Sequence, residues 1–161
     1  MDWVSMDSFK DNGNKPKAII AIDFDGTIVE HEYPAIGREI PGAVEVMREL
    51  IEKGYRLILL TMRSGQELDE AIRYCNQKKI DFWAVNHNPE QEKWTSSRKV
   101  YANVYIDDSG LGVPLARSSG TNNRARVDWA GVRRILTEWE VLEPVQTEAD
   151  SGDGVKRIGD I

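Results

Sequence analysis

The sequence predicts an α/β fold, a three-layer doubly wound parallel sheet of the Rossmann-like type with helices on both faces. Short apolar runs alternate with amphipathic segments of helical periodicity through most of the 161 residues. This alternation favours parallel strands joined by right-handed crossovers. Three of the runs also end in carboxylates or hydroxyls. Because ligands bind at the carboxyl ends of the strands in such sheets, we expect a functional site at that edge.

The first elements follow a polar leader over residues 1–17, which has no sustained period. A buried strand is expected over 18–24, and residues 26–40 form an irregular flap. Pro41 then opens a helix, since proline is tolerated in the first turn. Gly54 closes this helix.

A second strand is expected over residues 56–61. Ser64 and Glu67 form a capping-box pattern, which predicts the start of a second helix that runs to about Lys78. A third strand is expected over residues 82–86, where aromatic and β-branched side chains gather. A polar loop follows it.

The fourth strand is expected over residues 102–107, with a short edge strand near 113–116. Residues 117–126 are rich in Ser, Gly, Asn and Arg and are expected to form a surface loop. A last helix is expected over 127–140, and residues 142–161 form a polar tail that we expect to be disordered.

The composition is that of one globular domain, with 40% hydrophobic and 30% charged residues. The net charge of −6 argues against a dedicated nucleic-acid scaffold. No apolar run approaches the roughly 20 residues needed to cross a bilayer, and no secretory signal is visible. We therefore expect no membrane partner and a cytoplasmic location. Cys75, the single cysteine, excludes an internal disulfide and is expected in the core.

Four carboxylates are expected to converge at the carboxyl edge of the sheet. Asp23 and Asp25 follow the first strand, and Asp107 and Asp108 end the fourth. Like charges at close range repel strongly, and a hard divalent cation such as Mg²⁺ removes the conflict with oxygen ligands. A carboxylate can also attack phosphorus. Thr61 and a lysine would then stabilise the phosphoryl oxygens.

The motif Asp23-Phe24-Asp25-Gly26-Thr27, a strand-ending Thr61, a later lysine and Asp107-Asp108 resemble, in this order, the phosphatases of the haloacid dehalogenase superfamily. The resemblance covers about residues 18–140. We expect the corresponding domain to span residues 18–141. The resemblance implies a Mg²⁺-dependent phosphohydrolase that forms an aspartyl-phosphate intermediate. Neither insertion point leaves room for a cap domain, so the chain resembles a capless member.

The resemblance also implies a role for each matching residue. Asp23 resembles the nucleophile and a metal ligand, and Asp25 the general acid/base whose backbone carbonyl binds the metal. Thr61 and Lys99 resemble the phosphate-binding hydroxyl and lysine, with Lys93 as the competing lysine. Asp107 and Asp108 resemble metal ligands. The residues assigned to substrate binding are Gly26, Thr27, Met62 and Arg63.

The substrate class stays open among three alternatives. A small phosphorylated metabolite or nucleotide is the first, and a nucleic-acid or protein end-phosphatase, suggested by an open capless site, is the second. A catalytically idle phosphoester-binding module is the third. Arg117, Arg124 and Arg126 form either a contact for a phosphate-rich partner or a solvated loop. The flap 28–40 and the loop 109–126 are the candidates for setting specificity, and the oligomeric state is not indicated.

Three features of the sequence allow two interpretations each. Arg63 is either a second phosphate contact or a surface arginine. The segment Glu30-His31-Glu32 is expected to be a solvated loop, although it could touch substrate. His87 follows the third strand at the same edge, so it either lines the site or belongs to an ordinary loop.

Overall fold

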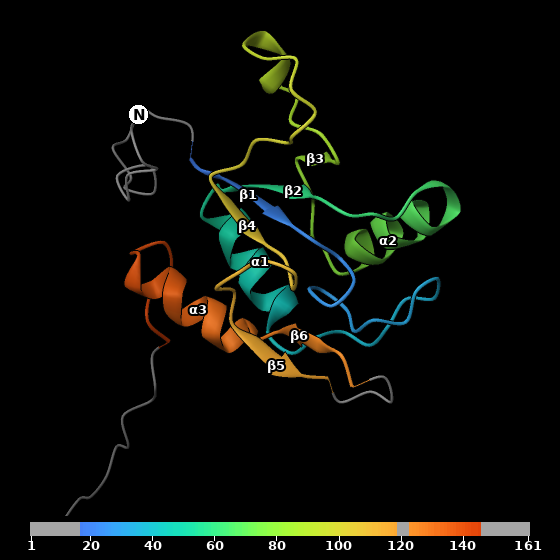
Figure 1. Ribbon diagram of the computed structural model, residues 1–161. Coiled ribbons are helices and arrows are strands. Elements are labelled where there is room, and N and C mark those ends of the chain that lie inside the picture. Colours follow the sequence, from blue (N-terminus) through green and yellow to red (C-terminus); the bar gives the residue numbers. More distant parts are fainter. Residues whose placement is uncertain (1–16, 119–122, 146–161) are drawn as a thin grey trace, which may run out of the picture.

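The computed structural model describes residues 17–118 and 123–145, and a parallel four-stranded sheet lies at its centre (Figure 1). The strands stand in the order β3-β2-β1-β4. Ile22 lies opposite both Leu59 and Ile106, so three strands end at one edge. The predicted parallel α/β sheet is therefore confirmed. The strand bounds are β1 Ile19–Ile22, β2 Arg56–Leu59, β3 Ala84–Val85 and β4 Val104–Ile106.

Three amphipathic helices pack against one face of this sheet. They are α1 (Ala43–Glu52), α2 (Gly65–Gln77) and α3 (Trp129–Glu138). Their buried side chains form one core with alternate strand residues such as Ile20 and Leu57. The two crossovers β1-α1-β2 and β2-α2-β3 step in the same direction across the sheet. Right-handed crossovers that step the same way put their helices on the same face.

The second face of the sheet was predicted to be covered by helices, but the structure covers it in another way. Ile19, Ala21 and Ile58 point to this face and pack with Trp83 and Val100. The connection from β3 back to β4 supplies this cover, and the regular element within it is a short 3₁₀ helix, η2 (Gln91–Lys93). In the described part of the chain, the expected helical layer on this face is thus replaced by a connecting segment.

Several element boundaries differ from the sequence prediction. Ser64 is the N-cap of α2, but its side chain makes no capping hydrogen bond, so the capping box does not form. Asp128 caps α3 instead, by accepting a hydrogen bond from the backbone N–H of Ala130. The expected loop 117–126 contains part of an antiparallel hairpin between β5 (Leu115–Arg117) and β6 (Ala125–Val127), so that prediction was wrong at both ends.

The polar leader and most of the tail lie outside the described residues, which begin at 17 and end at 145. The predicted disorder of the tail therefore stays a prediction. Among the described helices, none has the length and apolar character that a membrane-spanning segment needs.

Candidate functional site

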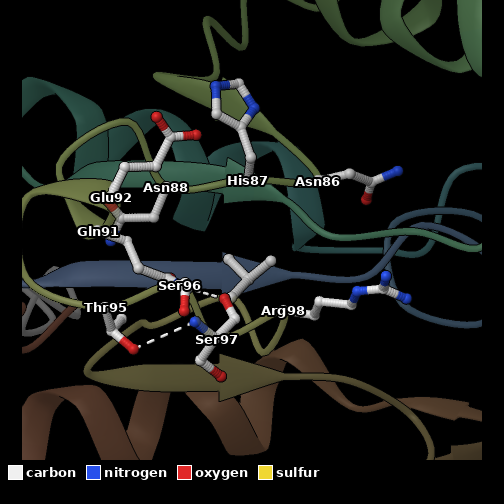
Figure 2. Close-up of a pocket in the computed structure, with 10 residues that line it drawn as sticks. Asn86, His87, Asn88, Gln91, Glu92, Thr95, Ser96, Ser97 and Arg98 are labelled. Carbon is white, nitrogen blue, oxygen red and sulfur yellow. Dashed lines mark hydrogen bonds between the residues drawn. The ribbon is translucent and has the colours of Figure 1, made fainter.

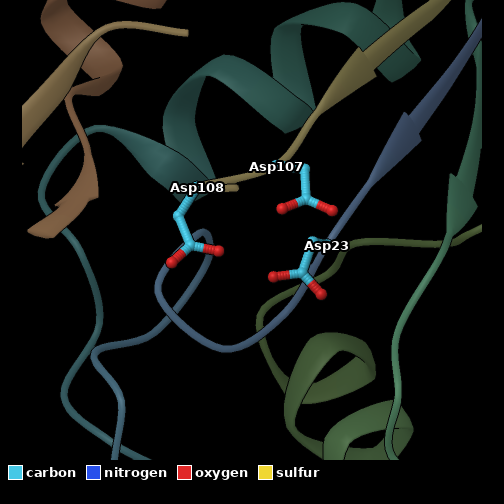
Figure 3. A group of neighbouring side chains, drawn as sticks. All are labelled: Asp23, Asp107 and Asp108. Atoms are coloured by element: carbon cyan, nitrogen blue, oxygen red, sulfur yellow. The ribbon is translucent and has the colours of Figure 1, made fainter. Parts of the chain in front are cut away.

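Three carboxylates gather where β1 and β4 end side by side (Figure 3). Asp23 follows β1, and its backbone N–H donates to the carbonyl of Ile106, the last residue of β4. Asp107 and Asp108 come directly after Ile106. One carboxylate oxygen from each of the three aspartates lies within 4.8 Å of the other two. Parallel pairing of two strands with matching ends is thus what brings these residues together.

The carboxylates face an open cavity of about 350 Å³. It is built from the ends of three elements: β1 with the flap, β2 and β4. Its volume falls within the range of small-molecule sites, which is about 300–1,000 Å³. The residues that line it are Asp23, Asp25, His31, Tyr33, Thr61, Met62, Arg63, Asp107, Asp108 and Ser109.

Burial raises the pKa of Asp23 from its ordinary value of 3.8 to about 7. Hydrogen bonds from the backbone N–H of Phe24 and from the Thr27 hydroxyl oppose this shift, whereas the charges of Asp107 and Asp108 add to it. The negative charge on Asp23 is therefore costly in the protein alone. A donor set made of carboxylate oxygens suits a hard divalent cation, whose charge would remove that cost.

Thr27 links the ends of β1 and β4, which carry the carboxylates, through hydrogen bonds. Its hydroxyl donates to Asp23 Oδ2 at 3.1 Å and accepts from the backbone N–H of Asp108 at 3.2 Å. The indole N–H of Trp129 donates to the Thr27 carbonyl at 2.6 Å. Thr27 is fully buried and does not line the cavity, so the structure gives it a positioning role where the sequence suggested substrate contact.

Gly26 makes the turn that lets the flap fold back over the strand end. Its φ of +82° lies in the region that favours glycine. A Cβ at this position would overlap with the His31 ring and come within 2.8 Å of Asp108 Oδ2. Glycine is therefore required by close approach as well as by backbone angle, and the residue shapes the site without lining its cavity.

Asp25 is engaged by a buried arginine. Arg63 Nε and Nη2 donate to the two carboxylate oxygens of Asp25, each at 2.7 Å. The same guanidinium donates to the flap carbonyls of Pro34 and Ala35. Asp25 raises the pKa of Arg63 further above its ordinary value. Only 2% of Arg63 is exposed, so it is neither a surface arginine nor a free phosphate contact.

Thr61 and Met62 contribute to the cavity from the end of β2. The Thr61 hydroxyl accepts from the backbone N–H of Arg63 at 3.2 Å, and the Thr61 backbone N–H donates to Asn86 Oδ1 at 2.8 Å. Met62 is almost fully exposed at the cavity rim. The structure thus brings Thr61 and Met62 to the carboxylates as the sequence predicted.

The predicted phosphate-site lysine is not at the cavity. Among the described residues that line it there is no lysine, and its one arginine is Arg63. Lys99 Nζ lies 5.9 Å from the ring centroid of Tyr105, which alternates with the core-facing residues Val104 and Ile106. Lys93 belongs to η2. Both lysines belong to the connection that covers the second face of the sheet, where no described α-helix follows β3 to return them to its edge.

No clear sequence signal indicates the role of His31. Its Nε2 lies 2.8 Å from Asp108 Oδ2, inside the cavity. Glu30 is likewise not solvated: it is 2% exposed and pairs with Arg38 and Arg126. The expected solvated loop is thus partly buried, since the Gly26 turn folds the flap inward. Nothing in the local sequence around this histidine indicates that the flap folds inward at Gly26.

The arginines proposed to contact a phosphate-rich partner lie on the β5–β6 hairpin and its connection. Arg126 Nε lies 3.4 Å from Glu30 Oε1, and the Arg126 side chain is largely buried. Its charge is therefore paired within the protein. Arg117 is exposed in β5, and Arg124 precedes β6. The hairpin therefore does not present the three arginines as one exposed basic surface.

Comparison with known proteins gives one informative relative. A solved structure of a conserved protein coded by a locus of Bacteroides thetaiotaomicron is similar to this chain, with 41% sequence identity and a TM-score of 0.62. The match covers 75% of this chain and 90% of the bacterial protein. No model of a known protein family matches the chain, and no curated protein sequence matches it either.

Proposed function

The chain belongs to the same family as the conserved Bacteroides thetaiotaomicron protein, and we propose that it is a Mg²⁺-dependent phosphohydrolase of the haloacid dehalogenase type. The observation that carries the proposal is the cluster of Asp23, Asp107 and Asp108, whose oxygens lie within 4.8 Å. Thr61 and Asp25 line the same cavity. The parallel sheet would be the capless core found in this superfamily. The substrate of the protein would be a small phosphomonoester.

Asp23, Asp107 and Asp108 would hold the cation, since they supply hard oxygen donors at the end of two adjacent strands. A bound Mg²⁺ would neutralise charge on the phosphoryl oxygens and on the carboxylates around it. The Thr61 hydroxyl, which lines the same cavity, would donate a hydrogen bond to a phosphoryl oxygen. The protein's own part is then to position the phosphate beside Asp23.

In the proposed reaction a carboxylate oxygen of Asp23 attacks phosphorus, and the bond from phosphorus to the ester oxygen breaks. Asp25, which lines the same cavity, protonates the departing alkoxide to give the alcohol. Asp25 then accepts a proton from water as the water oxygen attacks phosphorus, and the bond from phosphorus to the Asp23 oxygen breaks. Inorganic phosphate leaves, and both aspartates return to their starting states.

One observation favours a second candidate, a phosphoester-binding module without turnover. Both oxygens of Asp25 accept from Arg63, so the group that must exchange protons is already engaged. No lysine lines the described cavity to balance the phosphoryl charge. A module of this kind would bind a metal and a phosphate but would release no product.

The test is phosphate release from a panel of phosphomonoesters, including sugar phosphates, nucleotides and oligonucleotides with terminal phosphates. We expect turnover by the full chain with Mg²⁺ and none with EDTA. Asp23→Asn should abolish release, because an amide cannot act as the nucleophile. The matched control is Asp81→Asn, an exposed aspartate that does not line the cavity.

The outcomes separate the candidates. Turnover that survives Asp23→Asn would contradict the proposed mechanism. Binding of Mg²⁺ and phosphate without release from any member of the panel would favour the module without turnover. Release from terminally phosphorylated oligonucleotides alone would assign an end-phosphatase.

A further inference from the structure

A second cavity of about 510 Å³ lies beyond the end of β3 (Figure 2). β2 and β3 pair in parallel, with Leu59 opposite Val85, so they end at one edge. Thr61 follows the first strand and lines the carboxylate cavity. Asn86 follows the second strand and lines the new one. The two cavities therefore meet at the hydrogen bond from the Thr61 backbone N–H to Asn86 Oδ1.

The framework of this second cavity is fixed by two buried amides. Gln91 Nε2 donates to the carbonyls of Ser97 and Lys99, and its Oε1 accepts from the backbone N–H of Tyr101. Asn88 bonds to the carbonyl of Tyr101 and to the backbone N–H of Glu90. These amides have their main hydrogen-bonding partners within the loop. They hold the irregular segment after β3 in a defined shape and leave recognition to other side chains.

The remaining polar groups of the cavity are mostly donors. Within residues 17–118 and 123–145, neither Asn86 Nδ2 nor the Arg98 guanidinium has a hydrogen bond or ion pair. The Thr95 and Ser97 hydroxyl oxygens accept from backbone N–H groups, which leaves their hydrogens to donate. Glu92 is the one carboxylate in the lining. A cavity rich in donors and carrying an arginine suits an anionic group with several acceptor oxygens.

Asn86 connects the second cavity to the carboxylate cavity, and Arg98 extends alongside it. Asn86 and Arg98 extend in the same direction in Figure 2, away from Thr95 and Ser97. Asn86 Oδ1 accepts from the Thr61 backbone N–H, so Asn86 lies at the side of the second cavity next to Thr61. Among the described residues, Arg98 is the one arginine that lines the second cavity, and no lysine lines the carboxylate cavity.

We propose that the second cavity binds an anionic group on the leaving-group side of the substrate, so that the substrate is a phosphomonoester carrying a second phosphate or carboxylate. Arg98 is the residue that sets this preference, with Asn86 as a second donor. The proposal rests on the proposed function only in assigning the first phosphate to the carboxylate cavity. The size of the second cavity accommodates such a group, since small-molecule sites span about 300–1,000 Å³.

The test compares α,ω-alkanediol bisphosphates of increasing chain length with the matching ω-hydroxyalkyl monophosphates, with Mg²⁺ and the full chain. Calorimetry gives the dissociation constants, and where a ligand is hydrolysed the ratio of KM values replaces them. At the best length we expect the bisphosphate to bind about tenfold tighter, the gain typical of one charge-assisted pair. Arg98→Ala should remove this advantage. The control Arg134→Ala, an exposed arginine of α3, should keep it.

A second readout does not depend on turnover. The side-chain amide signal of Asn86 and the Nε–H signal of Arg98 should shift in NMR spectra with the bisphosphate but not with the monophosphate. Equal affinities at every length, or an advantage that survives Arg98→Ala, would overturn the proposal. Tighter bisphosphate binding without phosphate release would support the subsite while contradicting the proposed hydrolysis. No binding of either ligand would overturn both.

Discussion

Arg63 is the residue on which the geometry around Asp25 depends most directly. It is buried, and its three nitrogens bond to Asp25 and to two flap carbonyls. Arg63→Ala would leave the partly buried Asp25 carboxylate and two carbonyls without these donors. We expect the free energy of unfolding to fall by about 3 kcal/mol, as when one partner of a buried pair is removed.

Urea denaturation of the two variants Arg63→Ala and Arg134→Ala measures this effect. Arg134 is exposed on α3, so its removal should change stability by no more than about 0.5 kcal/mol. Equal stabilities for Arg63→Ala and the native protein would show that the buried guanidinium does not hold the flap to β2.

Asp23 predicts an unusual pH dependence of stability when metal is removed. Its pKa is about 7 in the folded protein against an ordinary value of 3.8, so between these values the folded chain binds more protons than the unfolded chain. The free energy of unfolding in EDTA should therefore fall as the pH rises from 5 to 8. The part due to Asp23 is about 2 to 3 kcal/mol.

Thermal unfolding in EDTA at pH 5 and at pH 8 tests this sign. Asp23→Asn should flatten the dependence, and Mg²⁺ at pH 8 should restore the stability of the native protein. The native protein could instead become more stable toward pH 8 in EDTA, to the same extent as Asp23→Asn. This result would rule out the raised pKa of Asp23.

At the residue scale, the sequence predicts the carboxylates better than it predicts their neighbours. Asp23, Asp107 and Asp108 follow apolar runs, and parallel pairing alone is enough to bring them together. The contacts of His31 and Arg63 depend on how the flap folds back at Gly26, which no local pattern encodes. The expected position of Lys99 was wrong, because the described segment after β3 contains a short 3₁₀ helix and no α-helix that would carry Lys99 to the edge.

At the scale of elements, α3 is linked to the first strand end by one buried hydrogen bond. The Trp129 indole N–H donates to the carbonyl of Thr27, whose hydroxyl orders Asp23 and Asp108. Trp129→Phe keeps a large aromatic ring but leaves this buried carbonyl without its donor. We expect a loss of about 1–3 kcal/mol in the free energy of unfolding, together with weaker metal binding.

The control for this link is Trp139→Phe, at the other end of α3 and outside the described carboxylate cavity. Chemical denaturation and a Mg²⁺ titration on both variants measure the two effects. If Trp129→Phe binds Mg²⁺ as tightly as the native protein, then α3 stabilises the fold without positioning the carboxylates.

The elements themselves follow from periodicity, whereas their placement does not. The sequence predicts the four strands and three helices because apolar spacing distinguishes strands from amphipathic helices. It did not predict that α1 and α2 share a face. That arrangement depends on the strand order β3-β2-β1-β4, in which both crossovers step the same way. The short edge strand expected near 113–116 overlaps β5, but β6 and its pairing with β5 were not predicted, because β6 is only three residues long.

At the scale of the whole molecule, Cys75 reports on the integrity of the main core. It is fully buried, and burial raises the pKa of its thiol to about 12. Alkylation by iodoacetamide requires an exposed thiolate, so the rate should follow opening of the core. We expect almost no labelling of the native protein at pH 8 and complete labelling in denaturant, as measured by intact mass. Rapid labelling without denaturant would contradict the packing of α2 on the sheet.

The most direct test of the central claim is a calorimetric titration of the metal-free chain with Mg²⁺ at pH 8. Asp23, Asp107 and Asp108 are expected to hold one ion, because their oxygens converge within 4.8 Å. The native protein and the control Asp81→Asn should each bind one Mg²⁺ with the same affinity, and Asp107→Asn should lose this binding. Absence of binding to the native protein, or equal binding to Asp107→Asn, would contradict the metal centre from which the proposed chemistry follows.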